Sequence, residues 1–129
     1  MEDLAVILDT NFLLIPEVHG VDILSELERI LNLKYELVIP EVVIGELRHI
    51  KKDGEPSEKK AASIALDLFD DVKIVESEKP ADEEILRLAS EMDSVVGTND
   101  KNLKKQLRNR GIPVIYLRQK SHLCVDGIV

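Results

Sequence analysis

The feature that most constrains the fold is an unbroken apolar run, Leu4 to Leu8, that ends directly on Asp9. A short apolar run rich in branched residues is typical of a strand covered on both faces, as in a parallel α/β sheet. Carboxylates are rarely buried unless they are paired or bound to a metal, and open α/β sheets bind ligands at the carboxyl ends of their strands. Asp9 is therefore a candidate functional residue. The alternative is that Asp9 only caps the next helix, because Asp and Thr both favour that position.

Strands and helices alternate along the rest of the chain. Further strands are predicted over residues 35–39, 72–75, 94–98 and 112–117, and helices over residues 21–31, 41–50, 57–70, 81–92 and 101–110. This alternation implies a parallel sheet covered on both faces. We therefore expect one domain over residues 1–129: a three-layer α/β/α sandwich whose central five-stranded parallel sheet has the order 3-2-1-4-5, which right-handed crossovers make economical. Residues 118–129 show no clear period and are expected to form a tail that packs on this domain or extends from it.

Local signals predict where some helices begin and end. Pro16 is expected to end a short helical turn that follows Asp9. Residues 51–57 contain Gly and Pro and are expected to form a loop, after which Ser57 caps the next helix. The spacing of apolar residues in that helix predicts that Leu68 faces inward.

The helix expected over residues 41–50 carries a carboxylate on its apolar face. At about 100° per residue, Glu46 falls near 40°, between Val42 at 0° and Ile50 near 80°. A carboxylate within a buried stripe needs a cation or strong hydrogen-bond donors. Glu46 is therefore predicted to bind a metal or another charge. The alternative is an internal ion pair with a lysine or arginine from another helix.

Two further acids are expected near the same edge of the sheet. Strand 94–98 also ends on a carboxylate, Asp100, and Asp82 lies in the first turn of helix 81–92, where acids complement the helix dipole whatever their function. If the first and fourth strands flank the topological switch point, Asp9 and Asp100 meet there, and the starts of two helices bring Glu46 and Asp82 close. Converging carboxylates repel one another unless a divalent cation neutralises them, and oxygen ligands favour Mg²⁺ or Mn²⁺. A metal held in this way suits phosphodiester hydrolysis.

Charge and composition limit the partners. Residues 1–99 carry 10 Lys and Arg against 23 Asp and Glu, whereas residues 100–129 carry 7 against 2. The acidic chain argues against broad non-specific nucleic-acid binding, but its basic end permits a phosphate contact in front of a metal-loaded site. The alternative is that these residues only solubilise a surface helix. The chain has a single cysteine, its three histidines lack the spacing of a zinc site, and no apolar run is long enough to span a membrane. These features indicate a cytoplasmic protein with no membrane contact.

The ordered set of acidic motifs resembles the signature of the PIN domain family. The motifs are Asp9-Thr10-Asn11, Glu46 within a helix, Ala81-Asp82 at a helix start and Thr98-Asn99-Asp100. The resemblance covers essentially the whole chain and implies a small α/β ribonuclease that depends on Mg²⁺ or Mn²⁺. It implies catalytic, metal-binding roles for Asp9, Glu46, Asp82 and Asp100, and supporting roles around the metal and water for Thr10, Asn11 and Thr98. Glu83 stands where closer relatives commonly have a second Asp, so the third acidic position is open between Asp82 and Glu83.

Within this family, the chain looks more like the ribosomal-RNA-processing endonucleases than like the VapC-type toxins. The likeness lies in residues 98–105 and 113–117, although the zinc-binding module of some relatives is missing. We expect a metal-dependent endoribonuclease that acts in ribosomal RNA processing. The alternatives are a toxin of a toxin–antitoxin pair and a PIN-fold RNA-binding or scaffold protein with little or no catalysis. A phosphatase or receiver domain of the aspartyl-phosphate type is disfavoured, because Asn11 replaces the second Asp and no lysine follows the last strand in the receiver manner.

The expected partners follow from the proposed RNA substrate. The residues expected to contact RNA are Lys101, Lys104, Lys105 and Arg108. A homodimer or a higher homo-oligomer is left open.

Overall fold

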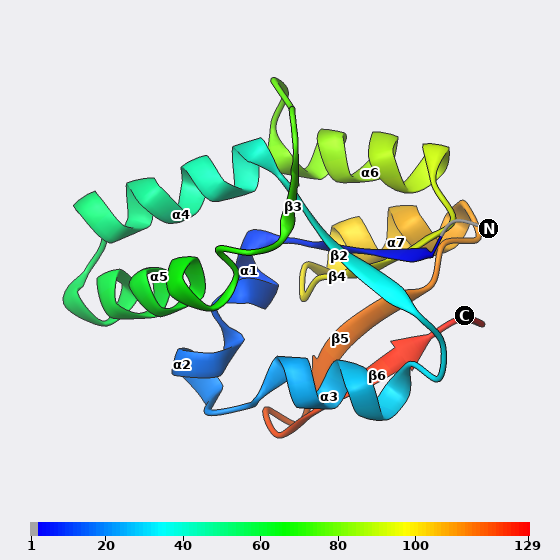
Figure 1. Ribbon diagram of the computed structural model, residues 1–129, viewed down its shortest axis with the longest axis horizontal. Helices are drawn as coiled ribbons and strands as arrows, with labels where there is room; N and C mark the ends of the chain where they lie inside the picture. Colours follow the sequence, from blue (N-terminus) through cyan, green and yellow to red (C-terminus); the bar gives the residue numbers. More distant parts are fainter. Residues whose placement is uncertain (1–2) are drawn as a thin grey trace.

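The computed structural model describes residues 3–129, which form one sheet flanked by helices (Figure 1). The strands are β1 (Leu4–Leu8), β2 (Tyr35–Pro40), β3 (Lys73–Val75), β4 (Ser94–Gly97), β5 (Val114–Arg118) and β6 (His122–Asp126). Their order in the sheet is β3-β2-β1-β4-β5-β6, and every neighbouring pair is parallel except β5 and β6. The predicted α/β class and the predicted order of the first five strands are confirmed. The prediction of a wholly parallel, five-stranded sheet is wrong, because an antiparallel sixth strand extends it.

Helices cover both faces of this sheet. They are α1 (Thr10–Leu13), α2 (Ile15–His19), α3 (Ile23–Ile30), α4 (Glu41–Asp53), α5 (Pro56–Leu68), α6 (Ala81–Glu91) and α7 (Lys101–Asn109). Leu4, Val6 and Leu8 of β1 join the apolar core beneath α1 to α5, while Ala5 and Ile7 join the core beneath α6 and α7. Because β1 is an inner strand between β2 and β4, the residue that follows it lies near the middle of the sheet edge. Within residues 3–129, every helix is too short or too polar to cross a membrane.

Residues 118–129, which were expected to form a tail, make a turn and then strand β6. Gln119 and Lys120 adopt positive φ values of 54° and 56°, and the Ser121 N–H donates to the Arg118 carbonyl oxygen at 3.2 Å. A two-residue turn of this kind matches the twist of the strands it joins and is usually marked by Asn-Gly. Its absence here concealed the hairpin from the sequence pattern.

Helix α3 covers the outer edge of β6. The Leu123 N–H donates to Glu26 Oε1 at 3.0 Å, and Arg29 Nη2 donates to the Leu123 carbonyl oxygen at 3.0 Å. These contacts satisfy backbone groups that an edge strand otherwise leaves open to another chain. The hydrogen bonds from Arg29, together with that from Leu123, lower the pKa of Glu26 to about 2.

Several local predictions are wrong. Pro16 lies in the first turn of α2, where its missing N–H costs no helical hydrogen bond, so it does not end a helix there. Helix α4 extends to Asp53, and the expected loop shrinks to two residues. Glu55 rather than Ser57 is the N-cap of α5, with its N–H bound to the Glu58 carboxylate at 3.0 Å. Leu68 is 47% exposed because it lies at the last turn of α5.

Candidate functional site

The site begins where β1 and β4 end side by side. Leu8 and Gly97 are the last paired residues of these strands, and the Asp9 N–H donates to the Gly97 carbonyl oxygen at 3.0 Å. Asp9 and Thr98 follow directly and are both buried, at 8% and 0% exposed. The polar residues predicted after the two strands therefore meet at the topological switch point of the sheet.

Thr98 joins two of the predicted acids. Its hydroxyl donates to Asp9 Oδ2 at 2.7 Å and accepts the Asp100 N–H at 3.1 Å. Asp9 Oδ1 also accepts the Thr10 N–H at 2.8 Å, so Asp9 is the N-cap of α1 as well as a candidate site residue. Burial raises the pKa of Asp9, the bonds from Thr98 and Thr10 lower it in part, and the nearby charges of Glu46 and Asp100 raise it.

Glu46 reaches this cluster from α4 through Thr10. The Thr10 hydroxyl donates to Glu46 Oε2 at 2.5 Å. The prediction that Glu46 lies within the buried stripe is wrong, because Glu46 is exposed and the buried side chains of α4 include Val43 and Leu47. The stripe is centred further round the helix than the assumed face, so Glu46 lies at its border. From there its carboxylate points toward the end of β1.

Asp100 is exposed and begins α7. Its Oδ1 accepts the N–H groups of Asn102 at 2.9 Å and Leu103 at 3.0 Å, which makes it the N-cap of that helix. These bonds fix one carboxylate oxygen, while the Thr98 hydroxyl fixes the backbone of the same residue. Asp100 therefore has a defined position next to Asp9.

A pair of asparagines ties three strand ends together. Asn11 Oδ1 accepts the Asn99 N–H at 3.0 Å, and Asn99 Oδ1 accepts the Leu117 N–H at 2.9 Å. Asn11 thus links the segment after β1 to the segment after β4, and Asn99 continues the link to β5. Asn99 was not singled out as a site residue, although its place between Thr98 and Asp100 mirrors the opening polar triplet.

Asp82 is not brought into the same network. It is exposed in the first turn of α6, and its Oδ1 accepts the N–H of Glu83 at 2.9 Å. The start of α6 nevertheless lies near that of α4, because the Val42 N–H donates to Ser77 Oγ at 2.9 Å. The structure therefore links Asp9 to Glu46 through Thr10 and to Asp100 through Thr98, and leaves Asp82 on an adjacent helix end.

Glu84, which was not predicted as a site residue, holds the loop before α6. Its side chain is 5% exposed, its Oε1 accepts from Arg87 Nε at 3.0 Å, and its Oε2 accepts the Glu78 N–H at 3.0 Å. The bond from Arg87 lowers the pKa of Glu84. Since the same loop carries Ser77, Glu84 helps to position the starts of α4 and α6. This role could not be predicted from the sequence, because an acid in the first turn of a helix is common whatever its function.

The acidic cluster suits a hard divalent cation by the type of its ligands, although its carboxylates are not gathered around one point. Among residues 3–129, no three His, Cys, Asp or Glu side chains lie close enough together to hold a metal ion. The converging side chains of Asp9, Glu46 and Asp100 supply only carboxylate oxygens, which Mg²⁺ and Mn²⁺ prefer. A cation would also offset the desolvation that raises the pKa of Asp9. Because Glu46 and Asp100 are exposed, their carboxylates can turn toward a cation without disturbing the core.

The four basic residues predicted to bind RNA lie on α7, but they differ in environment. Lys101 and Lys105 are exposed, whereas Lys104 and Arg108 are half-buried and contact the carboxylate of Asp126. Asp100 is the N-cap of this helix, so all four residues follow the candidate site along α7.

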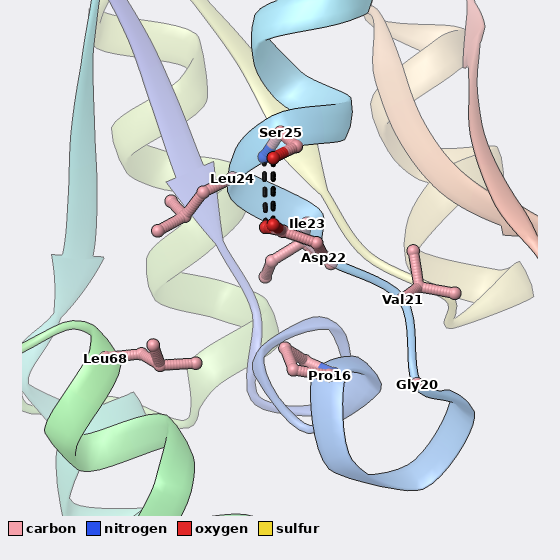
Figure 2. Close-up of a pocket in the computed structure, with 8 residues that line it drawn as sticks. All are labelled: Pro16, Gly20, Val21, Asp22, Ile23, Leu24, Ser25 and Leu68. Atoms are coloured by element: carbon pink, nitrogen blue, oxygen red, sulfur yellow. Dashed lines mark hydrogen bonds between the residues drawn. The ribbon is translucent and has the colours of Figure 1, made fainter.

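An apolar pocket lies elsewhere and shares no residue with the acidic cluster. It has a volume of about 460 Å³ and is open between the α2–α3 connection and the last turn of α5 (Figure 2). Its lining is mainly apolar, with Pro16, Leu24 and Leu68 facing the space and Asp22 bonded to Ser25 beside it. None of the predicted acids opens into it, so the pocket is not the candidate catalytic site.

Comparison with known proteins identifies the family. Residues 6–120 match the family model described as a PIN like domain. The chain belongs to this family. The PIN-like chain is 40% identical over 125 residues to Ribonuclease VapC4 of Methanocaldococcus jannaschii, which covers 94% of this chain and 95% of that protein. It is 30% identical over 120 residues to Ribonuclease VapC9 of Archaeoglobus fulgidus, over 93% and 87% of the two chains.

Solved structures share the PIN-like fold. That of the PIN domain endonuclease Utp24 matches with a TM-score of 0.77 and 27% identity, over 97% of this chain and 92% of that chain. A domain of a functionally unknown protein from Methanocaldococcus jannaschii has a TM-score of 0.58 and 18% identity, which shows the fold alone. The predicted PIN family is confirmed. The predicted distinction from the VapC-type toxins is not confirmed, because relatives with VapC names and the Utp24 structure all match.

Proposed function

We propose that this single-domain PIN-like chain is a cytoplasmic endoribonuclease that hydrolyses RNA phosphodiester bonds with Mg²⁺ or Mn²⁺. The observation that carries the proposal is the buried Asp9 at the switch point of the sheet, which Thr98 joins to Asp100 and Thr10 joins to Glu46. Three acids from distant parts of the sequence are linked there through two threonines, and within residues 3–129 none of the three forms a salt bridge with a lysine or arginine. This is the charge pattern expected of a cation site rather than of an internal ion pair.

Each residue of the cluster has a separate task. Asp9, Glu46 and Asp100 would hold the cation, and Asp82, with Glu83 as an alternative, would complete the set from the start of α6. When bound, the cation lowers the pKa of a water molecule and stabilises the charge on the phosphate oxygens. The Thr98 hydroxyl fixes one oxygen of Asp9, while Thr10 directs the Glu46 carboxylate toward the strand ends. Asn11 maintains the spacing between the two strand ends through the Asn99 N–H.

The basic face of α7 would contact the RNA backbone. Lys101, Lys104, Lys105 and Arg108 all follow Asp100 on this helix, in the part of the chain where positive charge exceeds negative charge. Phosphate contacts of this kind position a nucleic acid but do not read its sequence.

The RNA substrate has two candidates. We propose ribosomal RNA processing, which the likeness of residues 98–105 and 113–117 to processing endonucleases favours. The match to the structure of the PIN domain endonuclease Utp24 supports endonuclease activity. A second candidate, a toxin of a toxin–antitoxin pair, is favoured by 40% identity to Ribonuclease VapC4. Mapping the cut sites on a ribosomal RNA precursor and on non-ribosomal RNA distinguishes the two, because a processing enzyme cuts the precursor at defined positions.

The proposal is tested by RNA cleavage with Mn²⁺, with Mg²⁺ and with a chelator, using one structured and one single-stranded RNA. Wild-type protein is expected to cut only with a divalent cation, and Asp9→Asn is expected to abolish cutting. Asp67→Asn is the matched control, because Asp67 is an exposed acid of α5 and has no part in the cluster. Metal binding without cutting in wild type would instead favour a PIN-fold binding or scaffold protein.

A further inference from the structure

The carboxylate of Asp126 lies between two cations of α7. Its Oδ2 is 3.5 Å from Lys104 Nζ, and its Oδ1 is 3.3 Å from Arg108 Nε. Asp126 comes from the end of β6, so the contact joins two segments that are distant in the sequence. Apart from Asp100 in the candidate site, Asp126 is the only acid within the basic segment 100–129.

These contacts are weak and open to solvent. Both distances exceed the roughly 2.7–2.9 Å of a strong charge-assisted hydrogen bond. The side chains of Lys104, Arg108 and Asp126 are 27%, 33% and 45% exposed. Exposed ion pairs of this kind contribute little to folding and exchange readily with other ions. The Asp126 carboxylate can therefore be displaced without unfolding the protein.

The two cations have other contacts that hold them in place. Lys104 Nζ lies 3.6 Å from the centroid of the Tyr116 ring, and Arg108 Nη1 donates to the Ile112 carbonyl oxygen at 3.3 Å. Gly127, with φ 104°, leaves room for this guanidinium, because a Cβ there would lie 2.5 Å from Nη1. The pair of cations is thus already arranged for an anion with two oxygens, whether or not Asp126 supplies it.

This cation pair continues from the candidate active site along the same helix. Asp100 caps α7, and Lys104 and Arg108 follow about 6 Å and 12 Å further along the helix axis. Tyr116, beneath Lys104, is next to Leu117, whose N–H is bound by Asn99 at the edge of the site. An RNA strand that crosses the acidic cluster can continue along this face.

We propose that Lys104 and Arg108 form a binding site for one phosphate of the RNA backbone, and that Asp126 occupies this site until RNA displaces it. The inference rests on the proposed ribonuclease function, from which it takes the identity of the ligand. Two phosphate oxygens replace the two carboxylate oxygens, one against each cation. Asp126 therefore competes with the substrate and weakens RNA binding.

The experiment measures binding of a fluorescent single-stranded RNA by anisotropy, in a chelator so that no cleavage occurs, over a series of salt concentrations. Asp126→Asn is expected to bind the RNA about 3- to 10-fold more tightly than wild type, because a competing carboxylate is lost. Asp67→Asn removes the same charge from α5, on the opposite face of the sheet, and is expected to leave the affinity unchanged.

Substitution of the cations separates local competition from a change in net charge. Adding Lys104→Ala and Arg108→Ala to Asp126→Asn should cancel the gain in RNA affinity. It should also reduce the salt dependence of that affinity by the amount expected for the loss of about one phosphate contact or more. When Asp126 is retained, the double substitution Lys104→Ala and Arg108→Ala should weaken RNA binding relative to wild type. This measurement keeps the test valid if Asp126→Asn fails to fold.

Two results would overturn the inference. One is equal affinity of Asp126→Asn and Asp67→Asn, and the other is a gain that survives loss of both cations. If wild type cuts RNA with a divalent cation and Asp126→Asn binds no better, only this inference fails. If wild type neither binds nor cuts RNA, the proposed function fails with it.

Discussion

Thr98→Val tests whether the buried hydroxyl organises the acidic cluster. Valine has nearly the shape of threonine, so the substitution preserves the packing at this fully buried position and replaces the hydroxyl with a methyl group that cannot form a hydrogen bond. Two hydrogen bonds are lost: the one donated to Asp9 Oδ2 at 2.7 Å and the one accepted from the Asp100 N–H at 3.1 Å.

The expected cost follows from these two bonds. A hydrogen bond to a charged group contributes about 1.5–3 kcal/mol, and a partly buried N–H without a partner costs about 1 kcal/mol, so the loss is about 3 kcal/mol. With an unfolding entropy of about 2.1 cal/mol/K per residue, a chain of 129 residues should lose about 11 °C in Tm. Thr98→Ser keeps the hydroxyl and removes one buried methyl group, which should cost only about 1 kcal/mol, or about 4 °C.

The pH dependence gives an independent test. Burial raises the pKa of Asp9 above its ordinary value of 3.8, so its favourable contribution to stability is present below pH 3.8 and is lost as pH rises through the folded-state pKa. The Thr98 bond limits this loss because it stabilises the charged carboxylate. Thermal unfolding should therefore show a larger cost of Thr98→Val at neutral pH than at pH 3. A cost equal to that of Thr98→Ser, or one that does not change with pH, would refute the reasoning.

Three further outcomes are expected from thermal unfolding. Gly97→Ala should lose about 1–3 kcal/mol, because a Cβ would lie 3.0 Å from Leu8 Cδ2 and 3.1 Å from the Phe12 ring; an unchanged Tm would show that these side chains yield freely. Glu26→Gln should destabilise the protein at neutral pH, with a deficit that disappears as pH falls from 4.5 toward 2, since the folded-state pKa of Glu26 is about 2; a constant deficit would contradict this. Without metal, Asp9→Asn should raise the Tm at neutral pH, because it replaces a desolvated charge; a lower Tm would oppose this account.

Much of the fold was predictable because its buried elements have strong patterns. The apolar run from Leu4 to Leu8 identified the central strand, and the alternation of elements implied the order of the first five strands. Strand β6 was missed because its apolar residues, Leu123 to Val125, form neither a long run nor an alternation, and the Gln119–Lys120 turn lacks the glycine that usually marks it. Leu68 was misplaced because helical spacing cannot show where the neighbouring core ends.

The arrangement of the candidate site could be predicted where the direction of the strands determines which residues lie at the same edge of the sheet. The position of Asp9 beside Thr98 could be predicted because the two residues directly follow two adjacent buried strands. Glu46 joins the cluster for a different reason from the one predicted: it reaches Thr10 from the border of the helix rather than from the buried face. The place of Asp82 could not be derived, since it depends on how α6 packs. The contact of Asp126 with α7 could not be derived either, because it requires the unforeseen β6.

The central claim is that Asp9, Glu46 and Asp100 together bind a divalent cation, and a titration with Mn²⁺ tests it most directly. Each of three substitutions removes one charged ligand: Asp9→Asn, Glu46→Gln and Asp100→Asn. Each should weaken the affinity for Mn²⁺ by about tenfold or more, which corresponds to about 1.4 kcal/mol. Asn is also a good N-cap, so Asp100→Asn should keep α7 folded. Asp67→Asn should bind Mn²⁺ as wild type does. Equal binding by wild type and all three site variants, or no binding by folded wild type, would contradict the account.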